Sequence, residues 1–261
     1  MAEIYNANPN LKAIGVQVDY TPEQIEEYIK CKNDYIYFIE NYCQIVTLDH
    51  GLQLFKLYDC QKRKLKIIHE NRKVILMEGR QQGKTTSSAA YILWYTIFQD
   101  AKNVAILANK ATAAREVLAR YQTMFEGLPI WLQQGVKSWN KGDVELENGS
   151  KVFTSATSTS GIRGKSVNLL YVDEAAIIPN TVAEQFFTSV YPTISAGETT
   201  KILLSSTPLG YNHFWKFWND AENGKNGFVN CFIPYWEIPG RDEKWAAEQK
   251  AILGDLKYNQ E

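Results

Sequence analysis

The stretch that decides the fold is Glu78–Thr85, which reads E-G-R-Q-Q-G-K-T and is called the phosphate loop below. It follows an apolar run at 74–77 and precedes an amphipathic helical pattern, so strand, glycine turn and helix come in the order that binding a polyphosphate requires. Gly83 lets the backbone approach the phosphates, and the first amides of the helix face their oxygens. Lys84 would then place a positive charge on the β and γ phosphates, and Thr85 would offer a hydroxyl to Mg²⁺.

The usual pattern, G-x-x-x-x-G-K-[ST], is broken at its first position, where Glu78 stands and Gly79 follows one residue later. On these residues alone, an ordinary glycine turn that begins a helix with an exposed lysine stays open as an alternative.

Composition predicts a globular protein with a substantial core. The 261 residues are 45% hydrophobic, which suffices for one large domain or two small ones. No apolar run is long enough to span a bilayer, and residues 1–19 lack the features of a signal peptide, so we expect an intracellular protein with no membrane contact. The four cysteines show no C-x-x-C spacing and are expected to be reduced and mostly buried.

The charge balance does not indicate a self-sufficient DNA-binding domain. The net charge is −1, so any DNA contact must be local or shared between subunits. The densest basic segment, 56–73, is expected to form a solvated helix face. A DNA contact and a location near the nucleotide are the alternatives for this segment, and the loop around 139–141 is an equally plausible DNA contact.

Hydrophobic periodicity along the chain predicts an alternation of strands and helices, which is typical of a parallel α/β sheet. We expect helices at 21–42, 54–70, 111–125 and 245–261, buried strands at 103–108, 169–172 and 201–205, and a hairpin at 143–156 around Asn148-Gly149. The predicted domains are a helical N-terminal lead-in at 1–50, an α/β core at 51–240 and a C-terminal helix at 241–261.

A second apolar strand ends in paired carboxylates within L-L-Y-V-D-E, residues 169–174. Ligands in open α/β sheets lie beyond the carboxyl ends of the strands, which would place Asp173 and Glu174 beside the phosphate loop. Asp173 can hold Mg²⁺ through water, while Glu174 orients and polarises the attacking water. A plain helix start is the alternative for these two acids alone.

Phosphoryl transfer also needs an arginine, which contributes roughly 10³ to 10⁵ in rate. Arg80 lies in the phosphate loop and could act in cis, whereas Arg163, between two glycines, could reach a neighbouring subunit or be a surface arginine. The hydroxyls of Ser205, Ser206 and Thr207 follow another strand and could sense the γ-phosphate, or form a simple turn before Pro208.

Together these segments resemble the ATPase part of the large terminase subunit of tailed bacteriophages, the motor that packs DNA into an empty capsid. The resemblance rests on G-R-Q-Q-G-K-T-T at 79–86, Y-V-D-E-A-A at 171–176 and S-S-T-P at 205–208. Support comes from D-C-Q-K at 59–62, W-N-K-G at 139–142, G-I-R-G at 161–164 and N-H-F-W at 212–215.

The resemblance implies a P-loop NTPase of the ASCE/RecA-like class, with three layers, a mainly parallel central sheet, an added antiparallel hairpin and a helical lead-in. It implies ATP and Mg²⁺ as cofactors. Gln61 would read adenine, Arg80 would be the cis arginine, Arg163 would serve the adjacent subunit, and 205–207 would form the coupling motif. The nucleotide-binding residues would be Gln61, Gly79, Arg80, Gln81, Gln82, Gly83, Lys84, Thr85 and Thr86.

The partners implied are double-stranded DNA, the portal protein, the small terminase subunit and further copies of the chain in a pentameric ring on the capsid, with a monomer in isolation. The place of action would be the host cytoplasm, at the procapsid. Family members normally continue into a nuclease domain, and no nuclease activity is expected of these residues.

Three other functions remain as alternatives from the residues. A helicase-like ATPase would need a second α/β lobe, and a P-loop kinase would need an arginine-rich lid. A nucleotide-gated scaffold would bind ATP without turnover, which Glu174 argues against.

Overall fold

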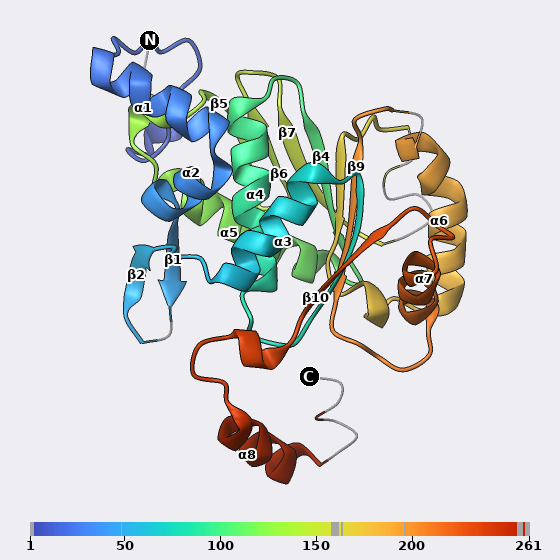
Figure 1. Ribbon diagram of the computed structural model, residues 1–261. Coiled ribbons are helices and arrows are strands. Elements are labelled where there is room, and N and C mark those ends of the chain that lie inside the picture. The colour runs from blue at the N-terminus through green and yellow to red at the C-terminus, as the bar shows by residue number, and fades with distance from the viewer. Residues whose placement is uncertain are drawn as a thin grey trace. The chain divides into compact units, whose positions relative to one another are not determined.

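The computed structural model describes residues 3–47, 49–157, 162, 164–195, 197–254 and 258 (Figure 1). The chain divides into two compact units. The first comprises Met1–Leu57, Thr86–Val104 and Arg115–Thr154, and the second comprises Tyr58–Thr85, Ala105–Ala114 and Ser155–Glu261. Four elements contribute residues to both units: α4 (Lys84–Phe98), β4 (Asn103–Ala108), α5 (Ala111–Glu126) and β7 (Lys151–Ala156).

The second unit is built on parallel strands. β3 (Lys73–Glu78) pairs with β10 (Val229–Ile233) on one side and with β9 (Lys201–Ser206) on the other, and β9 pairs with β8 (Leu169–Val172). β4 follows β8 in the strand order. Because parallel strands present their carboxyl ends at one edge, the segments that follow β3, β8 and β9 meet there.

Helices α3 (Asp59–Glu70), α6 (Asn180–Ser195), α7 (His213–Glu222) and α8 (Glu243–Leu253) complete the second unit, with 3-10 turns η3 (Ala175–Ile177) and η4 (Tyr235–Glu237) (Figure 1). α6 and α7 pack through Phe187 and Phe217, whose ring centroids lie 4.6 Å apart. The predicted terminal helix begins at Glu243 rather than at 245 and ends at Leu253, because Gly254 adopts φ +76° there.

The first unit combines helices with antiparallel strands. Its helices are α1 (Pro22–Asn33), α2 (Tyr35–Tyr42) and α5 (Ala111–Glu126), with 3-10 turns η1 (Tyr5–Ala7) and η2 (Ile130–Leu132). β6 (Asp143–Leu146) pairs antiparallel with β5 (Val136–Trp139) and with β7, and Gly149 takes φ +81° in the intervening turn. The predicted hairpin is therefore confirmed.

An aromatic cluster forms much of the core of the first unit. The ring of Phe98 on α4 lies 5.2 Å from that of Tyr28 and 5.3 Å from that of Phe38, in edge-to-face geometry. Trp94, one turn earlier on α4, donates its indole N–H to the Cys31 carbonyl at 3.0 Å. Aromatic pairs of this geometry stabilise beyond their buried area, so α4 is fixed against α1 and α2.

Two predicted helices have different bounds in the structure. The helix expected over 21–42 is two helices, because Asp34 leaves helical geometry at φ −132° and its carboxylate accepts the Tyr37 amide at 2.8 Å as the cap of α2. The helix expected from residue 54 begins only at Asp59, because β2 (Gly51–Leu54) pairs antiparallel with β1 (Gln44–Thr47). α1 begins with a capping box, in which the Thr21 hydroxyl accepts the Gln24 amide and the Thr21 amide donates to the Gln24 side chain.

The structure also shows the state of the cysteines and the length of the described helices. All four cysteines are free and buried. None of the helices in the described part of the chain is long and apolar enough to cross a membrane.

Candidate active site

The phosphate loop leaves the carboxyl end of β3 at a buried ion pair. Glu78 ends the strand, and its side chain has no exposed surface. Lys64 on α3, also fully buried, donates to the two carboxylate oxygens at 2.9 and 3.1 Å, and to the carbonyl of Lys84 at 3.2 Å. The glutamate that breaks the usual loop pattern thus anchors the loop at its base, and the expected solvated face of the basic segment is wrong for Lys64.

Within the loop, side-chain amides fix the main chain. Gln82 is buried and its side-chain oxygen accepts the Gly79 amide at 3.1 Å. Gln61 accepts the Tyr58 amide at 3.1 Å and donates to the Gln82 carbonyl at 3.0 Å. The Gln61 side chain therefore holds the loop in this structure, and its role in reading adenine stays a prediction.

Gly83 is required by both backbone conformation and space. Its φ is +75°, in the left-handed region that favours glycine. A Cβ at this position would lie 2.5 Å from the Gln61 side-chain nitrogen. In this structure the Gln61 side chain occupies the space beside Gly83, and the approach of the Gly83 backbone to phosphates stays a prediction.

The acids after β8 contact the start of α4, as the strand order requires. The ammonium of Lys84 lies 2.6 Å from a carboxylate oxygen of Glu174. The Thr85 hydroxyl donates to the Asp173 carboxylate at 3.3 Å, and the Tyr171 hydroxyl donates to its other oxygen at 2.9 Å. Two segments about ninety residues apart therefore form one polar cluster, in which Lys84 contacts Glu174 and Thr85 contacts Asp173.

The electrostatics of this cluster favour a cation. Burial raises the pKa of the Asp173 carboxyl above its usual range, and the neighbouring Glu174 raises it further, against smaller opposing effects of Tyr171, Lys84 and Thr85.

The backbone of Glu174 lies in the left-handed region at φ +51°, which is uncommon for a residue with a side chain of this kind. Such backbone strain is typical of functional sites, where the surrounding structure fixes it.

The segment after β9 contacts the same acids. The Ser206 hydroxyl donates to Glu174 at 3.4 Å and accepts the Ala176 amide at 3.0 Å. Thr207 is buried, and the buried Ser205 hydroxyl makes no hydrogen bond to any residue in the described ranges. The structure thus links one member of the predicted coupling motif, Ser206, directly to Glu174.

The predicted arginines and the remaining loop residues differ in their placement. The Arg80 and Gln81 side chains are exposed, and Gln81 has φ +55°. Thr86 accepts a hydrogen bond from Arg120 at 3.3 Å. Arg163 lies outside the described residues.

Three residues of this site were not predicted from the sequence: Lys64, Tyr171 and Arg241. Arg241, just before α8, donates to the carbonyls of Arg80 at 3.1 Å and of Gln81 at 2.8 Å. Side chains two apart on a strand share a face, so the spacing of Tyr171 and Asp173 could have indicated their contact. No local pattern marks Lys64 or Arg241.

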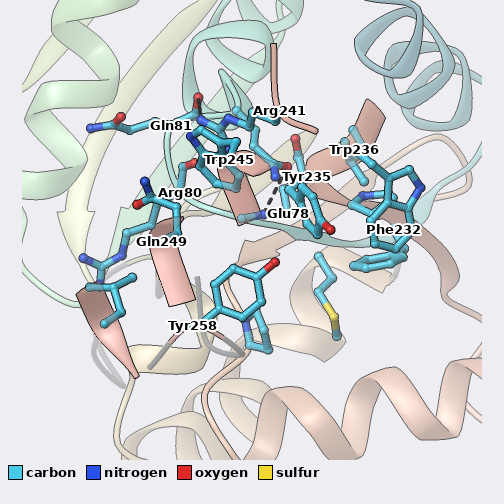
Figure 2. Close-up of a pocket in the computed structure, with 17 residues that line it drawn as sticks. Glu78, Arg80, Gln81, Phe232, Tyr235, Trp236, Arg241, Trp245, Gln249 and Tyr258 are labelled. Carbon is cyan, nitrogen blue, oxygen red and sulfur yellow. Dashed lines mark hydrogen bonds between the residues drawn. The ribbon is translucent and has the colours of Figure 1, made fainter. Parts of the chain in front are cut away.

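A cavity of about 660 Å³ borders the outer side of the phosphate loop (Figure 2). Residues 77–82 form one wall, and aromatic side chains from the end of β10, η4, α8 and residue 258 form much of the rest. Figure 2 shows Arg241 beside Trp245, and its guanidinium carbon lies 4.8 Å from the centre of that ring. A cavity with largely aromatic walls and a few polar groups is typical of a small-molecule binding site.

The chain is similar in sequence to known proteins of one family. A family model described as the terminase large subunit, T4-like virus type, N-terminal, matches residues 75–255. The terminase large subunit of Thermus virus P23-45 is 26% identical over 215 residues, which cover 70% of this chain and 43% of that protein. This chain spans less than half the length of the curated relatives it matches.

Solved structures show the same fold. The HK97 bacteriophage large terminase aligns with a TM-score of 0.70 at 18% identity, over 87% of this chain and 53% of that one. The ATPase domain of the Thermus phage P74-26 large terminase aligns at 0.61 and 18% identity, over 79% of this chain and 92% of that one. A large terminase from a thermophilic bacteriophage, in complex with ATP-gamma-S, aligns at 0.59 and 14% identity, over 78% and 51%.

The predicted P-loop NTPase fold with a mainly parallel sheet is thus confirmed. Because the family model covers well over half of the residues, the chain belongs to the family of terminase large subunits of the T4-like virus type, matching their N-terminal region.

Proposed function

We propose that this chain is the ATP-hydrolysing motor domain of a terminase large subunit that drives double-stranded DNA into a procapsid. The observation that carries the proposal is the cluster in which Lys84 lies 2.6 Å from Glu174 and Thr85 lies 3.3 Å from Asp173. Phosphoryl transfer asks for a cation on the phosphates, a metal site and a group that aligns water, and this cluster offers all three.

The residues fit a magnesium ion. Mg²⁺ prefers oxygen ligands and in such sites takes one or two carboxylates together with substrate phosphates. Asp173 is a buried carboxyl whose pKa is raised by burial and by Glu174, and the Thr85 hydroxyl lies beside it. Among the described residues no group of three or more histidines, cysteines or acids could hold a metal alone, in keeping with a site completed by phosphates. The ion would neutralise charge on the phosphate oxygens.

The ion pair of Lys84 and Glu174 suggests how binding prepares hydrolysis. Phosphates entering the loop would attract the Lys84 ammonium, which would free the Glu174 carboxylate to orient a water and accept its proton. Ser206 contacts Glu174 directly and would pass the change to the segment after β9. Arg80 in cis and Arg163 toward a neighbouring subunit are the arginines proposed to balance charge on the γ-phosphate.

The partners follow from the family. We expect double-stranded DNA, a portal protein, a small terminase subunit and further copies in a pentameric ring, acting in the host cytoplasm. A P-loop kinase would transfer phosphate to an acceptor, and Glu174 beside Asp173 is better suited to activating water.

The test is phosphate release from MgATP, measured against protein concentration with and without double-stranded DNA. We expect Glu174→Gln to lower release by roughly 10²- to 10⁴-fold while ATP still binds, the range for loss of a general base. Lys84→Ala should lose nucleotide affinity. The matched control is Glu116→Gln, since Glu116 is exposed on α5, and it should keep wild-type turnover. Absence of ATP binding to folded wild-type protein in calorimetry would refute the proposal.

A further inference from the structure

The carbonyls on the outer side of the phosphate loop are held by side chains from elsewhere in the second unit. Arg241 donates to the Arg80 carbonyl at 3.1 Å and to the Gln81 carbonyl at 2.8 Å. Gln61 donates to the Gln82 carbonyl at 3.0 Å. Three successive carbonyls are thus each bonded by a side chain, two of them by one guanidinium.

This arrangement fixes where the loop amides point. All peptide bonds of the described chain are trans, and in a trans peptide the C=O and the following N–H point in opposite directions. Holding the carbonyls of residues 80–82 therefore directs each amide of residues 81–83 away from the side chain that holds the preceding carbonyl. Successive amides pointing into one concavity form the nest that binds phosphate oxygens.

Arg241 also strengthens those amides and stabilises a costly conformation. A charged donor on a carbonyl polarises the peptide unit, so the N–H of the same unit becomes a better donor. Gln81 has φ +55°, a left-handed conformation that is unfavourable for a residue with a Cβ, and the Arg241 bond to its carbonyl opposes a return to a more favourable conformation.

The segment before α8 is built to present this guanidinium. Gly240 turns the chain at φ +82°, and Asp242 caps α8 by accepting the Trp245 amide at 2.8 Å. The Trp245 ring lies 4.8 Å from the guanidinium carbon, within the range of a cation–π contact. Figure 2 shows Arg241 and Trp245 side by side near Gln81.

We propose that Arg241 is a positioning residue of the nucleotide site: it fixes the phosphate loop from its outer side so that the loop amides face the polyphosphate, and it makes nucleotide affinity depend on the segment that leads into α8. This inference rests on the proposed ATPase function. The proposal adds to the nucleotide site a residue that lies about 160 positions from the loop along the chain. No contact between Arg241 and the nucleotide is required.

The test compares Arg241→Gln, Arg241→Lys and the control Arg63→Gln. Arg63 is a suitable control because its guanidinium also bonds a carbonyl, that of Phe232 at 3.0 Å, and an acid of η4, Glu237 at 2.8 Å, without touching the loop. Calorimetry with MgADP and with an uncleavable ATP analogue gives the affinities. Hydrogen exchange without nucleotide reports on the amides of 80–84 and, separately, on α8.

We expect Arg241→Gln to weaken both nucleotides by about 10- to 100-fold, the size expected for losing hydrogen bonds from a charged donor. The loop amides should exchange faster. Arg241→Lys should recover part of the affinity, because an ammonium lacks the fork that spans two carbonyls. Arg63→Gln should stay within twofold of wild type.

Affinity within twofold of wild type and unchanged loop exchange in Arg241→Gln would overturn the inference. Faster exchange confined to α8 would show a role in that helix alone and would also overturn it. If Arg241→Gln fails to fold, Arg241→Lys serves as the test instead. Wild-type nucleotide affinity and wild-type exchange of the loop amides in Arg241→Lys would then contradict the proposal. Lack of nucleotide binding by the wild type would refute the ATPase function, while the exchange measurement would still test Arg241.

Discussion

Breaking the buried ion pair of Lys64 and Glu78 should strongly destabilise the second unit. Both side chains are fully buried, and the ammonium bonds the two carboxylate oxygens and the Lys84 carbonyl. Glu78→Gln keeps the side-chain shape but removes the charge that Lys64 contacts. Removing one partner of a buried pair costs about 3–5 kcal/mol, because the other charge stays buried without compensation. Native stability is only about 5–15 kcal/mol, so the loss would be large.

A double-mutant cycle separates this pair from general packing. Lys64→Met should cost about 3–5 kcal/mol for the same reason, whereas the double variant with Glu78→Gln should lose only about 1–3 kcal/mol, the cost of an imperfectly paired neutral amide. The coupling between the two sites should then reach at least about 3 kcal/mol. Lys64 also bonds the first residue of α4, so the single variants should weaken nucleotide binding as well.

The assay is urea unfolding followed by far-UV circular dichroism on the wild type, both single variants and the double variant. The control is Lys66→Met on the same helix, because Lys66 and Glu70 form an exposed pair at 3.9 Å. Its effect should stay within about 0.5 kcal/mol. A loss below about 1 kcal/mol for Glu78→Gln, or a coupling below about 1 kcal/mol, would refute the reasoning.

Three further changes have expected outcomes. Gly83→Ala should abolish ATP binding in calorimetry, because its Cβ would lie 2.5 Å from Gln61 at φ +75°; near-normal affinity would contradict this. Tyr171→Phe removes the 2.9 Å bond to Asp173 and should cost about 1–3 kcal/mol in urea unfolding, with slower phosphate release; unchanged stability and turnover would speak against it. Burial lowers the pKa of His213 below its usual 6.5, so the folded state binds fewer protons than the unfolded one just below that pH, and stability should fall as the pH drops below 6.5. His213→Gln should remove this part of the pH dependence, and identical pH profiles of unfolding would count against it.

Local patterns in the sequence predicted much of the fold. β4, α5, the β6–β7 hairpin and β8 match the expected segments closely, because apolar runs, helical periodicity and the Asn148-Gly149 turn act within a few residues. β10 was not predicted, although it pairs with β3, because its sequence V-N-C-F-I lacks a regular alternation of polar and apolar residues. The break at Asp34 was missed because an Asp within a helical pattern can cap as well as continue a helix.

The candidate site likewise contains residues that the sequence predicted and contacts that only the structure shows. Lys84, Thr85, Asp173 and Glu174 were predicted because each follows a strand, and parallel strands bring such positions to one edge. Only the structure shows that the Lys84 ammonium contacts the Glu174 carboxylate at 2.6 Å. The structure alone also shows that the Gln61 side chain bonds the main chain of Tyr58 and Gln82, since Gln61 looks like an ordinary polar helix position in the sequence.

By itself the sequence determined the strand, loop and helix of the proposed phosphate site and the acids that face them, since short-range periodicity and spacing decide these. Only the tertiary structure decided what holds the loop: Lys64 on Glu78 at its base and Arg241 on its outer carbonyls, 161 residues from Arg80 along the chain. These partners are fixed by the path of the chain and by the need of buried charges and carbonyls for a hydrogen bond, and that need can be met from any distance in sequence.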